Sequence, residues 1–245
     1  MLVGIARSQL SQCLAFKGGT ALKRCYFGDY RFSEDLDFTL LPGATLDQVL
    51  AEFPAAFEHT HCDSGISTSI SRSESMQGQN SYTFYIAYDG PLPATNRPKE
   101  IKCDITLTEA IVFPLAKKRV LQAYPEFTDL TPIDEVTIYC LNEIATEKTL
   151  AVLDQAHTEP RDLYDLSFLT SEGINIGDLK HAIIEKLKFR NRTLEEVSGN
   201  LQRKEARFRA AWQPRLGNQM STLPHFEDTF RDVQRSLRQV GILPN

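Results

Sequence analysis

The sequence has 245 residues, of which 42% are hydrophobic and 24% are charged, and its formal net charge is −5. This composition predicts a globular protein with a substantial core, and it excludes helical membrane proteins, because no stretch approaches the roughly 18 consecutive apolar residues of a span. The first residues are too polar for a secretion signal, so we expect a cytoplasmic protein. The five cysteines are widely spaced without a C-x-x-C pair, which argues against a zinc site or a disulfide framework.

The charges are unevenly distributed along the chain. Residues 1–179 contain 14 Lys and Arg against 25 Asp and Glu, whereas residues 180–245 contain 13 Lys and Arg against 7 Asp and Glu. An acidic body followed by a basic C-terminal part favours a metal-binding centre beside a surface that binds a polyanion. A solvated basic helix face would give the same distribution and stays open as the alternative.

Hydrophobic patterning predicts a strand-rich first half. A short apolar run at residues 14–16 leads into a Gly-Gly turn and then a helix, for which Thr20 is a plausible cap or first-turn residue. Alternation with a period of two predicts several further strands. The remaining predicted elements are strands at 35–40, 66–71, 81–88 and 101–107, a helix at 45–57, a polar turn around 77–80 and a loop at 96–99.

After Pro114 the strand signals give way to helical periodicity. The predicted helices lie at residues 138–153, 161–169, 179–188, 193–212 and 226–240. We expect a domain boundary near residues 115–135. The chain is accordingly divided into a catalytic lobe at residues 1–125 and a helical lobe at residues 126–245.

The first motif is Gly18-Gly19-Thr20, which lies between a predicted strand and a predicted helix. Paired glycines allow the backbone to approach a ligand closely, and the start of a helix favours an anion. The motif therefore predicts a phosphate cradle, although it lacks the ending of a Walker loop. A tight turn without a ligand is the common alternative for two glycines in this position.

The second motif is Ser33-Glu34-Asp35-Leu36-Asp37. Residues two apart in a strand point the same way, so Asp35 and Asp37 would present two carboxylates side by side. Two like charges on one face destabilise each other unless a cation lies between them, and oxygen ligands select Mg²⁺ or Mn²⁺. Leu36 and Phe38 would face the core, which favours a metal site over a solvated strand face.

A third carboxylate lies on the strand predicted at residues 101–107. Alternation places Asp104 on the face opposite Cys103 and Ile105, where a neighbouring strand could bring it beside Asp35 and Asp37. Three carboxylates from two strands can hold one or two metal ions and activate a hydroxyl for in-line attack on a phosphate. A lone aspartate on a strand would be interpreted as structural. The Gly-Gly turn and the Asp35–Asp37 motif upstream favour a role in the site instead.

The helical half contributes a lysine and two aspartates. Lys148 shares a helix face with Ile144 and Val152, whereas Asp162 and Asp165 share a face of the next helix. A lysine on an apolar face either extends outward or points into a site, for which a phosphate would be a suitable target. A salt bridge between Lys148 and one of the aspartates is the structural alternative, and both interpretations can hold together.

These residues together resemble a known family. The segments FKGGTALKRCYFGDYRFSEDLDF, IKCDI and EIATEKTLAVL followed by RDLYDL are similar to the AbiEii/AbiGii toxin family of nucleotidyltransferases. This family belongs to the DNA polymerase β-like superfamily, and MenT toxins are related to it. The resemblance covers almost the whole chain, including Phe208, Trp212 and the stretch from Leu223 to Phe226.

The resemblance implies an α+β fold, in which a polymerase β-like lobe with a mixed sheet precedes a helical C-terminal lobe. It implies that Gly18, Gly19 and Thr20 hold the triphosphate. The metal would be held by Asp35 and Asp37, with Asp104 as the third carboxylate. In the second lobe, Lys148 would contact phosphate and Asp162 would be the acidic residue. Family members often carry an arginine between that lysine and the Arg-Asp pair, where this chain has residues 154–157, Asp-Gln-Ala-His. They also often have a longer helical segment before the Gly-Gly motif, which 17 residues precede here.

We therefore expect a Mg²⁺- or Mn²⁺-dependent nucleotidyltransferase that moves a nucleotide from an NTP to an acceptor hydroxyl. RNA, with the 3′ end of tRNA as the leading candidate, is the expected acceptor. The resemblance further implies a toxin of a toxin–antitoxin or phage-defence pair, with a cognate antitoxin protein as partner and no membrane association. The alternatives are a binding module with weak catalysis and an enzyme that modifies a protein or a small molecule.

Overall fold

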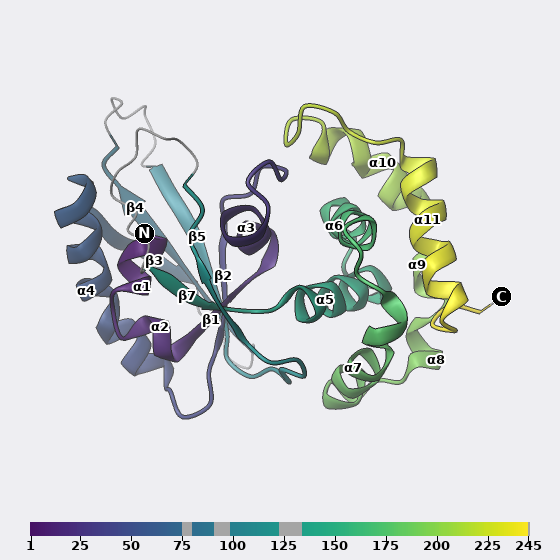
Figure 1. Ribbon diagram of the computed structural model, residues 1–245, viewed down its shortest axis with the longest axis horizontal. Coiled ribbons are helices and arrows are strands. Elements are labelled where there is room, and N and C mark those ends of the chain that lie inside the picture. Colours follow the sequence, from purple (N-terminus) through teal and green to yellow (C-terminus); the bar gives the residue numbers. More distant parts are fainter. Residues whose placement is uncertain (75–79, 91–98, 123–133, 245) are drawn as a thin grey trace. The chain divides into compact units, whose positions relative to one another are not determined.

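The computed structural model describes residues 1–74, 80–90, 99–122 and 134–244 (Figure 1). Most of the turn expected at 77–80 and of the loop expected at 96–99 lies outside these residues. The chain forms two compact units. The first comprises Met1–Glu109 and Leu115–Tyr139, and the second comprises Ala110–Pro114 and Cys140–Asn245.

The first unit contains a mixed sheet of seven strands among its described residues. Their order across the sheet is β3-β4-β5-β2-β1-β7-β6, with β2–β5 and β1–β7 parallel and the other neighbours antiparallel (Figure 1). The strands are β1 (Leu14–Lys17), β2 (Leu36–Leu40), β3 (Thr68–Glu74), β4 (Ser81–Tyr88), β5 (Lys99–Thr106), β6 (Ala116–Arg119) and β7 (Glu135–Ile138).

Alternation along the central strands separates an apolar sheet face from a polar one. Phe16, Phe38 and Phe84 are buried, and the rings of Phe84 and Phe53 meet edge to face with centroids 4.9 Å apart. Phe53 belongs to α4, and the apolar face of the sheet is covered by α1 (Leu2–Ala6), α2 (Leu10–Cys13) and α4 (Leu46–Ser64) (Figure 1). Burial of this face fixes the register, because a shift by one residue would expose every aromatic side chain.

The other face of the sheet carries the short helix α3 (Gly18–Ala21), which continues as the π-helical turn η1 (Leu22–Tyr26). Helix α3 begins directly after β1, with Lys17 at its N-cap position. Thr20 therefore lies in the first turn of the helix and not at its cap. This strand–turn–helix connection places the Gly-Gly motif beside β2.

The second unit is helical. Its described helices are α5 (Leu141–Leu153), α6 (Pro160–Ser171), α7 (Ile176–Phe189), α8 (Leu194–Val197), α9 (Asn200–Arg203), α10 (Glu205–Leu216) and α11 (Phe226–Gln239). The prediction of one continuous helix at 193–212 was wrong, since α8, α9 and α10 occupy this region. The capping box of Thr193 and Glu196 begins α8, and the buried polar side chains of Asn200 and Lys204 interrupt the apolar periodicity.

Two strands of the sheet were not predicted: β6 lies in the expected catalytic lobe and β7 in the expected helical lobe. β7 pairs with β1 through Phe16 and Ile138, and β6 pairs with β7. The units therefore divide after Tyr139, downstream of the expected boundary at 125–126, and α5 begins at Leu141 instead of residue 138. Strands of four residues are too short for alternation to distinguish them from loops or helix ends. The class itself, an α+β fold with a mixed sheet, is confirmed.

Candidate active site

A row of polar side chains crosses four neighbouring strands on the sheet face opposite the aromatic core. Lys17 on β1 is the register partner of Asp37 on β2, Asp37 is the partner of Asp104 on β5, and Asp104 is the partner of Thr83 on β4. Partners in a sheet point to the same face, so the two aspartates are direct neighbours. The structure thus brings together Asp37 and Asp104, as the sequence predicted, and Asp35 directly precedes β2.

Each oxygen of Asp104 has a hydrogen-bond donor. The Thr83 hydroxyl donates to Oδ1, and Lys102 Nζ donates to Oδ2 over 2.5 Å. Partial burial would lower the pKa of Lys102, but its attraction to Asp104, with Asp35 and Asp37 nearby, raises the pKa above its usual value. Lys102 therefore acts as the protein's own counter-cation for this carboxylate group.

Asp37 and Asp104, with Asp35 just before β2, are called the carboxylate row. The Gly-Gly turn lies against this row. Gly18 has a φ of +81°, and a side chain at this position would collide with the carboxylate of Asp37. A side chain at Gly19 would collide with the guanidinium of Arg31, which is buried. Gly18 is thus required by its backbone conformation, and a side chain at position 19 would have to displace the Arg31 guanidinium.

The segment that leads to Asp35 is tied to the same turn. The buried hydroxyl of Thr20 lies 2.9 Å from that of Ser33, and the Arg31 guanidinium packs over the ring of Tyr30. No role was predicted for Arg31, and Ser33 was named only as the first residue of the Asp35–Asp37 motif, because no periodic pattern marks this segment. Lys17 could have been found, since it follows the buried Phe16 on the strand that enters the turn.

The carboxylates have the chemistry that a hard divalent cation requires. Asp37 and Asp104 offer oxygen ligands on one sheet face, Asp35 directly precedes β2, and all three are partly open to solvent. Within the described ranges, no three Asp, Glu, His or Cys side chains surround a common point as metal ligands do. The donor set fits Mg²⁺ or Mn²⁺, and ligation by Asp104 would require its Oδ2 to exchange Lys102 for the metal.

A second polar cluster lies within the helical unit. Lys148 on α5 is 2.5 Å from Asp162 Oδ1 and 2.8 Å from Asp165 Oδ2, both on α6. Burial alone would raise the pKa of Asp162, but Lys148 and His157 more than offset this effect and hold the pKa well below its usual value. The salt bridge that the sequence left open is therefore present, and Lys148 has two carboxylate partners.

The connector between α5 and α6 (residues 154–159) adds a side chain that sequence reasoning missed. His157 Nε2 lies 2.5 Å from Asp162 Oδ2. Two buried side chains hold this part of the chain: Lys204 Nζ donates to the carbonyls of Asp154 and His157, and Asn200 donates to the carbonyl of Leu153. No spacing rule links residue 204 to residue 157, so only the fold could reveal this arrangement.

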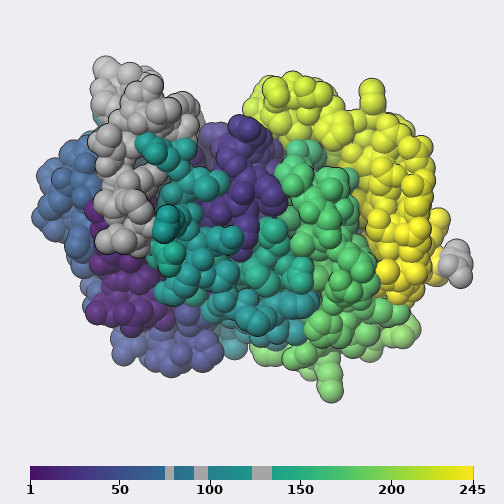
Figure 2. All heavy atoms as spheres, in the orientation of Figure 1, coloured from purple at the N-terminus to yellow at the C-terminus, as the bar shows by residue number. Residues whose placement is uncertain are grey.

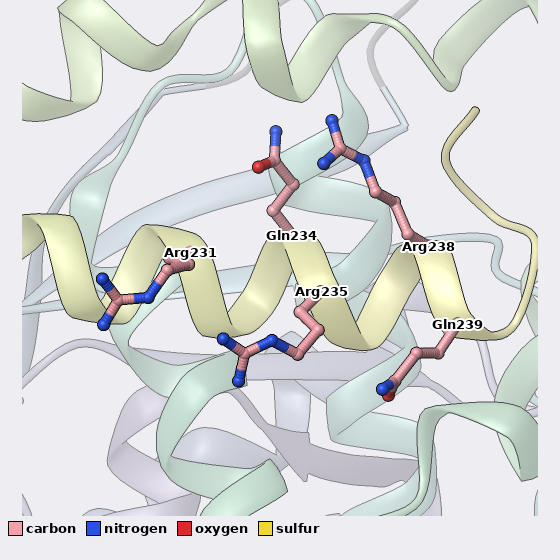
Figure 3. A pocket seen from close by; sticks show the side chains of 5 residues that line it. All are labelled: Arg231, Gln234, Arg235, Arg238 and Gln239. Atoms are coloured by element: carbon pink, nitrogen blue, oxygen red, sulfur yellow. The ribbon is translucent and has the colours of Figure 1, made fainter. Parts of the chain in front are cut away.

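The basic C-terminal part forms an arginine face on α11. Arg231, Arg235 and Arg238, with Gln234 and Gln239, line a shallow depression of about 310 Å³ (Figure 3). Helix α11, at the yellow end of the colour scale, forms part of the molecular surface in Figure 2. Arg231 and Arg235 are about 60% exposed and pair with Asp228 and Asp232, so part of their charge is balanced within the helix.

The described part of the chain contains no helix that is both long enough and apolar enough to cross a membrane. A comparison with curated protein sequences gave no match. The chain does match the family model described as "Nucleotidyl transferase AbiEii toxin, Type IV TA system" over residues 1–236.

Three solved structures are similar at 19% sequence identity, a level that supports the fold alone. JHP933 from Helicobacter pylori has a TM-score of 0.53, and the matched region covers 98% of this chain and 86% of the JHP933 chain. A putative nucleotidyltransferase from H. pylori has a TM-score of 0.55, with coverages of 98% and 89%. MenT4, the nucleotidyltransferase toxin Rv2826c from Mycobacterium tuberculosis H37Rv, has a TM-score of 0.59, with coverages of 97% and 83%. On the strength of the family match, this chain belongs to the AbiEii nucleotidyltransferase toxins of type IV toxin–antitoxin systems.

Proposed function

We propose that the carboxylate row is the reaction centre of a Mg²⁺- or Mn²⁺-dependent transfer of a nucleotide from an NTP to a hydroxyl group. The observation that carries this proposal is the pairing of Asp37 with Asp104, with the Gly-Gly turn against Asp37. Two adjacent carboxylates repel each other, and a cationic ligand would relieve that repulsion. An arrangement that only stabilised the fold would not need like charges on neighbouring strands.

The proposed roles follow from the chemistry of each group. Asp35, Asp37 and Asp104 would hold the metal, which neutralises charge on the triphosphate and on the departing pyrophosphate. Gly18, Gly19 and Thr20 form the turn that would hold the triphosphate. Asp104, already a hydrogen-bond acceptor, would orient the attacking hydroxyl and accept its proton.

For the second unit, we propose that Lys148 contacts phosphate while Asp162 holds it in place. Two carboxylates already orient its ammonium group, so little rearrangement is needed when a phosphate approaches. Preorganised positive charge stabilises negative charge that develops during phosphoryl transfer. This role is compatible with the structural one, since the same ion pairs also satisfy a buried lysine.

We propose RNA as the acceptor, with the 3′ end of tRNA as the first substrate to test. The support is the arginine face of α11, whose guanidinium groups suit a phosphate backbone. The family implies a cognate antitoxin, and a place in phage defence is a corresponding proposal. Because NTPs and tRNA are cytoplasmic, we expect the protein to act there.

The test is incubation of the protein with each radiolabelled NTP, Mg²⁺ and total cellular RNA, followed by gel electrophoresis. We expect one NTP to label a small-RNA band, and Asp37→Asn to abolish the labelling. Asp89→Asn, which removes the same charge from an exposed position after β4, is the matched control. Labelling of a protein band instead would transfer the proposal to a protein acceptor, and no labelling with any NTP would contradict it.

A further inference from the structure

The sheet face that carries the carboxylate row continues beyond Asp104 onto β4 and β3. Tyr85 on β4 is two residues from Thr83, the register partner of Asp104, so its side chain lies on the same face as the carboxylates. Diagonal neighbours of this kind are about 7–8 Å apart in an antiparallel pair. Arg72 on β3 is in turn the register partner of Tyr85. Tyr85 and Arg72 therefore extend the polar face toward the edge of the sheet at β3.

The guanidinium group of Arg72 lies over the ring of Tyr85, with Cζ 3.3 Å from the ring centroid. All three guanidinium nitrogens donate to carboxylates: Nη1 to Glu74 over 2.7 Å, and Nε and Nη2 to Glu100 over 3.3 and 3.2 Å. The Arg72 side chain is nevertheless 48% exposed. Because the carboxylates take the edge of the group, a ligand that approaches from solvent meets its flat outer face.

A β-bulge gives Arg72 this position. The register of β3 against β4 shifts just before Arg72, so that Ser71 is the additional residue. The Ser71 hydroxyl donates to Glu100 over 2.6 Å. Hydrogen bonds from Ser71 and Arg72 lower the pKa of Glu100, so this carboxylate stays ionised and holds the arginine. Bulges re-aim side chains beside active sites, and an edge strand that only ended the sheet would not need an arginine oriented in this way.

A flat guanidinium group that rests on an aromatic ring is a surface on which nucleobases stack. Phosphate recognition requires guanidinium N–H groups and an excess of positive charge. At Arg72 both are already used, because Glu74 and Glu100 accept from every nitrogen and balance the charge. The chemistry of this surface therefore selects a base over a phosphate backbone.

The order of the strands indicates which substrate reaches this surface. This step rests on the proposed function, in which the Gly-Gly turn holds the triphosphate and Asp104 orients the attacking hydroxyl. The attacking and leaving oxygens lie roughly in line, on opposite sides of the α-phosphorus. The turn follows β1, on one side of Asp37, whereas Asp104 and then Tyr85 lie on the other side. Pyrophosphate therefore departs on the β1 side, and the acceptor enters over β5, β4 and β3.

We propose that Arg72 and Tyr85 form a stacking platform for the terminal base of the acceptor RNA. The base rests on the outer face of the Arg72 guanidinium, and the hydroxyl of the same nucleotide lies at Asp104. The platform requires an unpaired end, since a base within a duplex is already stacked on its neighbours. Every base has a flat face, so the platform accepts any base and binds purines more strongly than pyrimidines.

The first experiment measures RNA binding without catalysis. Short single-stranded RNAs that end in a purine nucleotide or in an abasic nucleotide are titrated with the wild type and Arg72→Lys, in Mg²⁺ and without NTP. Lysine can keep the ion pairs but has no flat face. We expect Arg72→Lys to weaken binding of the purine-ended RNA by roughly 10-fold and to leave binding of the abasic RNA unchanged.

The matched control is Arg119→Lys, the same substitution at an exposed arginine of β6, which should bind both RNAs as the wild type does. Equal weakening of both RNAs by Arg72→Lys, or no weakening of either, would overturn the platform. The salt dependence of binding should keep its slope in Arg72→Lys, since no phosphate contact is lost. A shallower slope would assign Arg72 to the phosphate backbone and overturn the proposal as well.

Substitutions of Tyr85 separate stacking from folding. Tyr85→Phe keeps the ring and should bind the purine-ended RNA as the wild type does, whereas Tyr85→Leu should weaken binding as Arg72→Lys does. The melting temperatures of Arg72→Lys and Tyr85→Phe should stay close to that of the wild type. Full binding by Tyr85→Leu would overturn the role of the ring.

Transfer assays connect the platform to the reaction. Arg72→Lys should raise the KM for RNA by roughly 10-fold and leave the KM for the NTP unchanged. A raised KM for the NTP with unchanged RNA binding would overturn the assignment to the acceptor. Base-dependent RNA binding by a protein that transfers no nucleotide would support the platform and contradict the proposed reaction. Transfer to RNA without any contribution from the terminal base would support the reaction and overturn the platform.

Discussion

The carboxylate row of the sheet and the ion-pair cluster of the helical unit differ in how their charges are paired. On the sheet, Asp37 and Asp104 are partly exposed neighbours of the same sign. In the helical unit, Lys148, Asp162 and Asp165 are buried and paired with opposite charges. In the first arrangement Lys102 pairs with Asp104, but the neighbouring aspartates still repel each other, whereas in the second each charge has a buried partner of opposite sign and the arrangement depends on all its members.

This difference predicts that substitutions in the carboxylate row and in the ion-pair cluster impair the protein for different reasons. Removing a carboxylate from the row should affect the reaction and leave the fold intact. Removing Lys148 should affect both, because it leaves two buried carboxylates without their cation. The following predictions test this contrast, starting with the largest expected effect.

The largest expected effect is the loss of transfer in Asp37→Asn. Removing a metal ligand should lower the rate on the order of 10³-fold, since metal ions contribute several kcal/mol of transition-state stabilisation. The melting temperature should stay unchanged or rise slightly, because the repulsion with Asp104 is relieved. Steady-state kinetics and thermal melting measure the two effects, and a clear fall in melting temperature would assign Asp37 a structural role.

Lys148→Met should lose stability as well as activity. Two buried carboxylates without their lysine should cost about 3–5 kcal/mol in the free energy of unfolding, as measured by chemical denaturation. Adding Asp162→Asn and Asp165→Asn to this variant should restore most of the stability but not the activity. Lys188→Met, at an exposed position on α7, is the control. A stable and fully active Lys148→Met protein would contradict both the structural and the functional role.

Lys204 provides a pH-dependent test of the helical unit. Burial lowers its pKa from 10.5 to about 8. Below pH 8 the lysine is charged in both states and the folded state bears the full cost of burying it. Between pH 8 and 10.5 the folded state loses this proton while the unfolded state keeps it, so stability rises with pH. The unfolding free energy of the wild type relative to Lys204→Met should therefore rise by about 3 kcal/mol over this range.

The measurement is urea denaturation of both proteins at a series of pH values, since their difference removes the titration of all other groups. A flat difference would mean that Lys204 keeps its ordinary pKa despite its burial.

The smallest effect is expected at the arginine face of α11. Replacing Arg231, Arg235 and Arg238 with Gln should weaken RNA binding and make its salt dependence shallower, by about one unit of slope for each phosphate that the protein no longer neutralises. Replacing Lys117, Lys118 and Arg119 of β6 with Gln removes the same charge from the other unit. Equal weakening by both triple substitutions would indicate general attraction to RNA, and an unchanged slope in the α11 variant would contradict its role.

Much of the sheet could be predicted because burial imposes its pattern directly on the sequence. The alternation around Asp37 and Asp104 identified both strands and the face on which the carboxylates lie. The parallel pairing that makes them neighbours could not be deduced, since it depends on the order of strands that are distant in the sequence. β6 and β7 were missed for a similar reason, because strands of four residues carry too little pattern.

In the helical unit, helix spacing identified Lys148 and the two aspartates but not the residues around them. His157 lies on a connector without periodicity, and Lys204 lies within the stretch that was predicted to be one helix at residues 193–212. Both positions depend on α9 packing against α5, where Asn200 reaches the carbonyl of Leu153. Such contacts between distant segments leave no local signal in a single sequence.

The central claim is that Asp37 is a metal ligand in nucleotidyl transfer, and a change of metal preference tests it most directly. Transfer of labelled nucleotide by Asp37→Cys would be measured with Mg²⁺, Mn²⁺ and Cd²⁺, since a thiolate binds hard Mg²⁺ poorly and soft Cd²⁺ well. We expect almost no transfer with Mg²⁺ and recovery with Cd²⁺ or Mn²⁺, while Asp89→Cys behaves as the wild type does. Full activity of Asp37→Cys with Mg²⁺ would contradict the account.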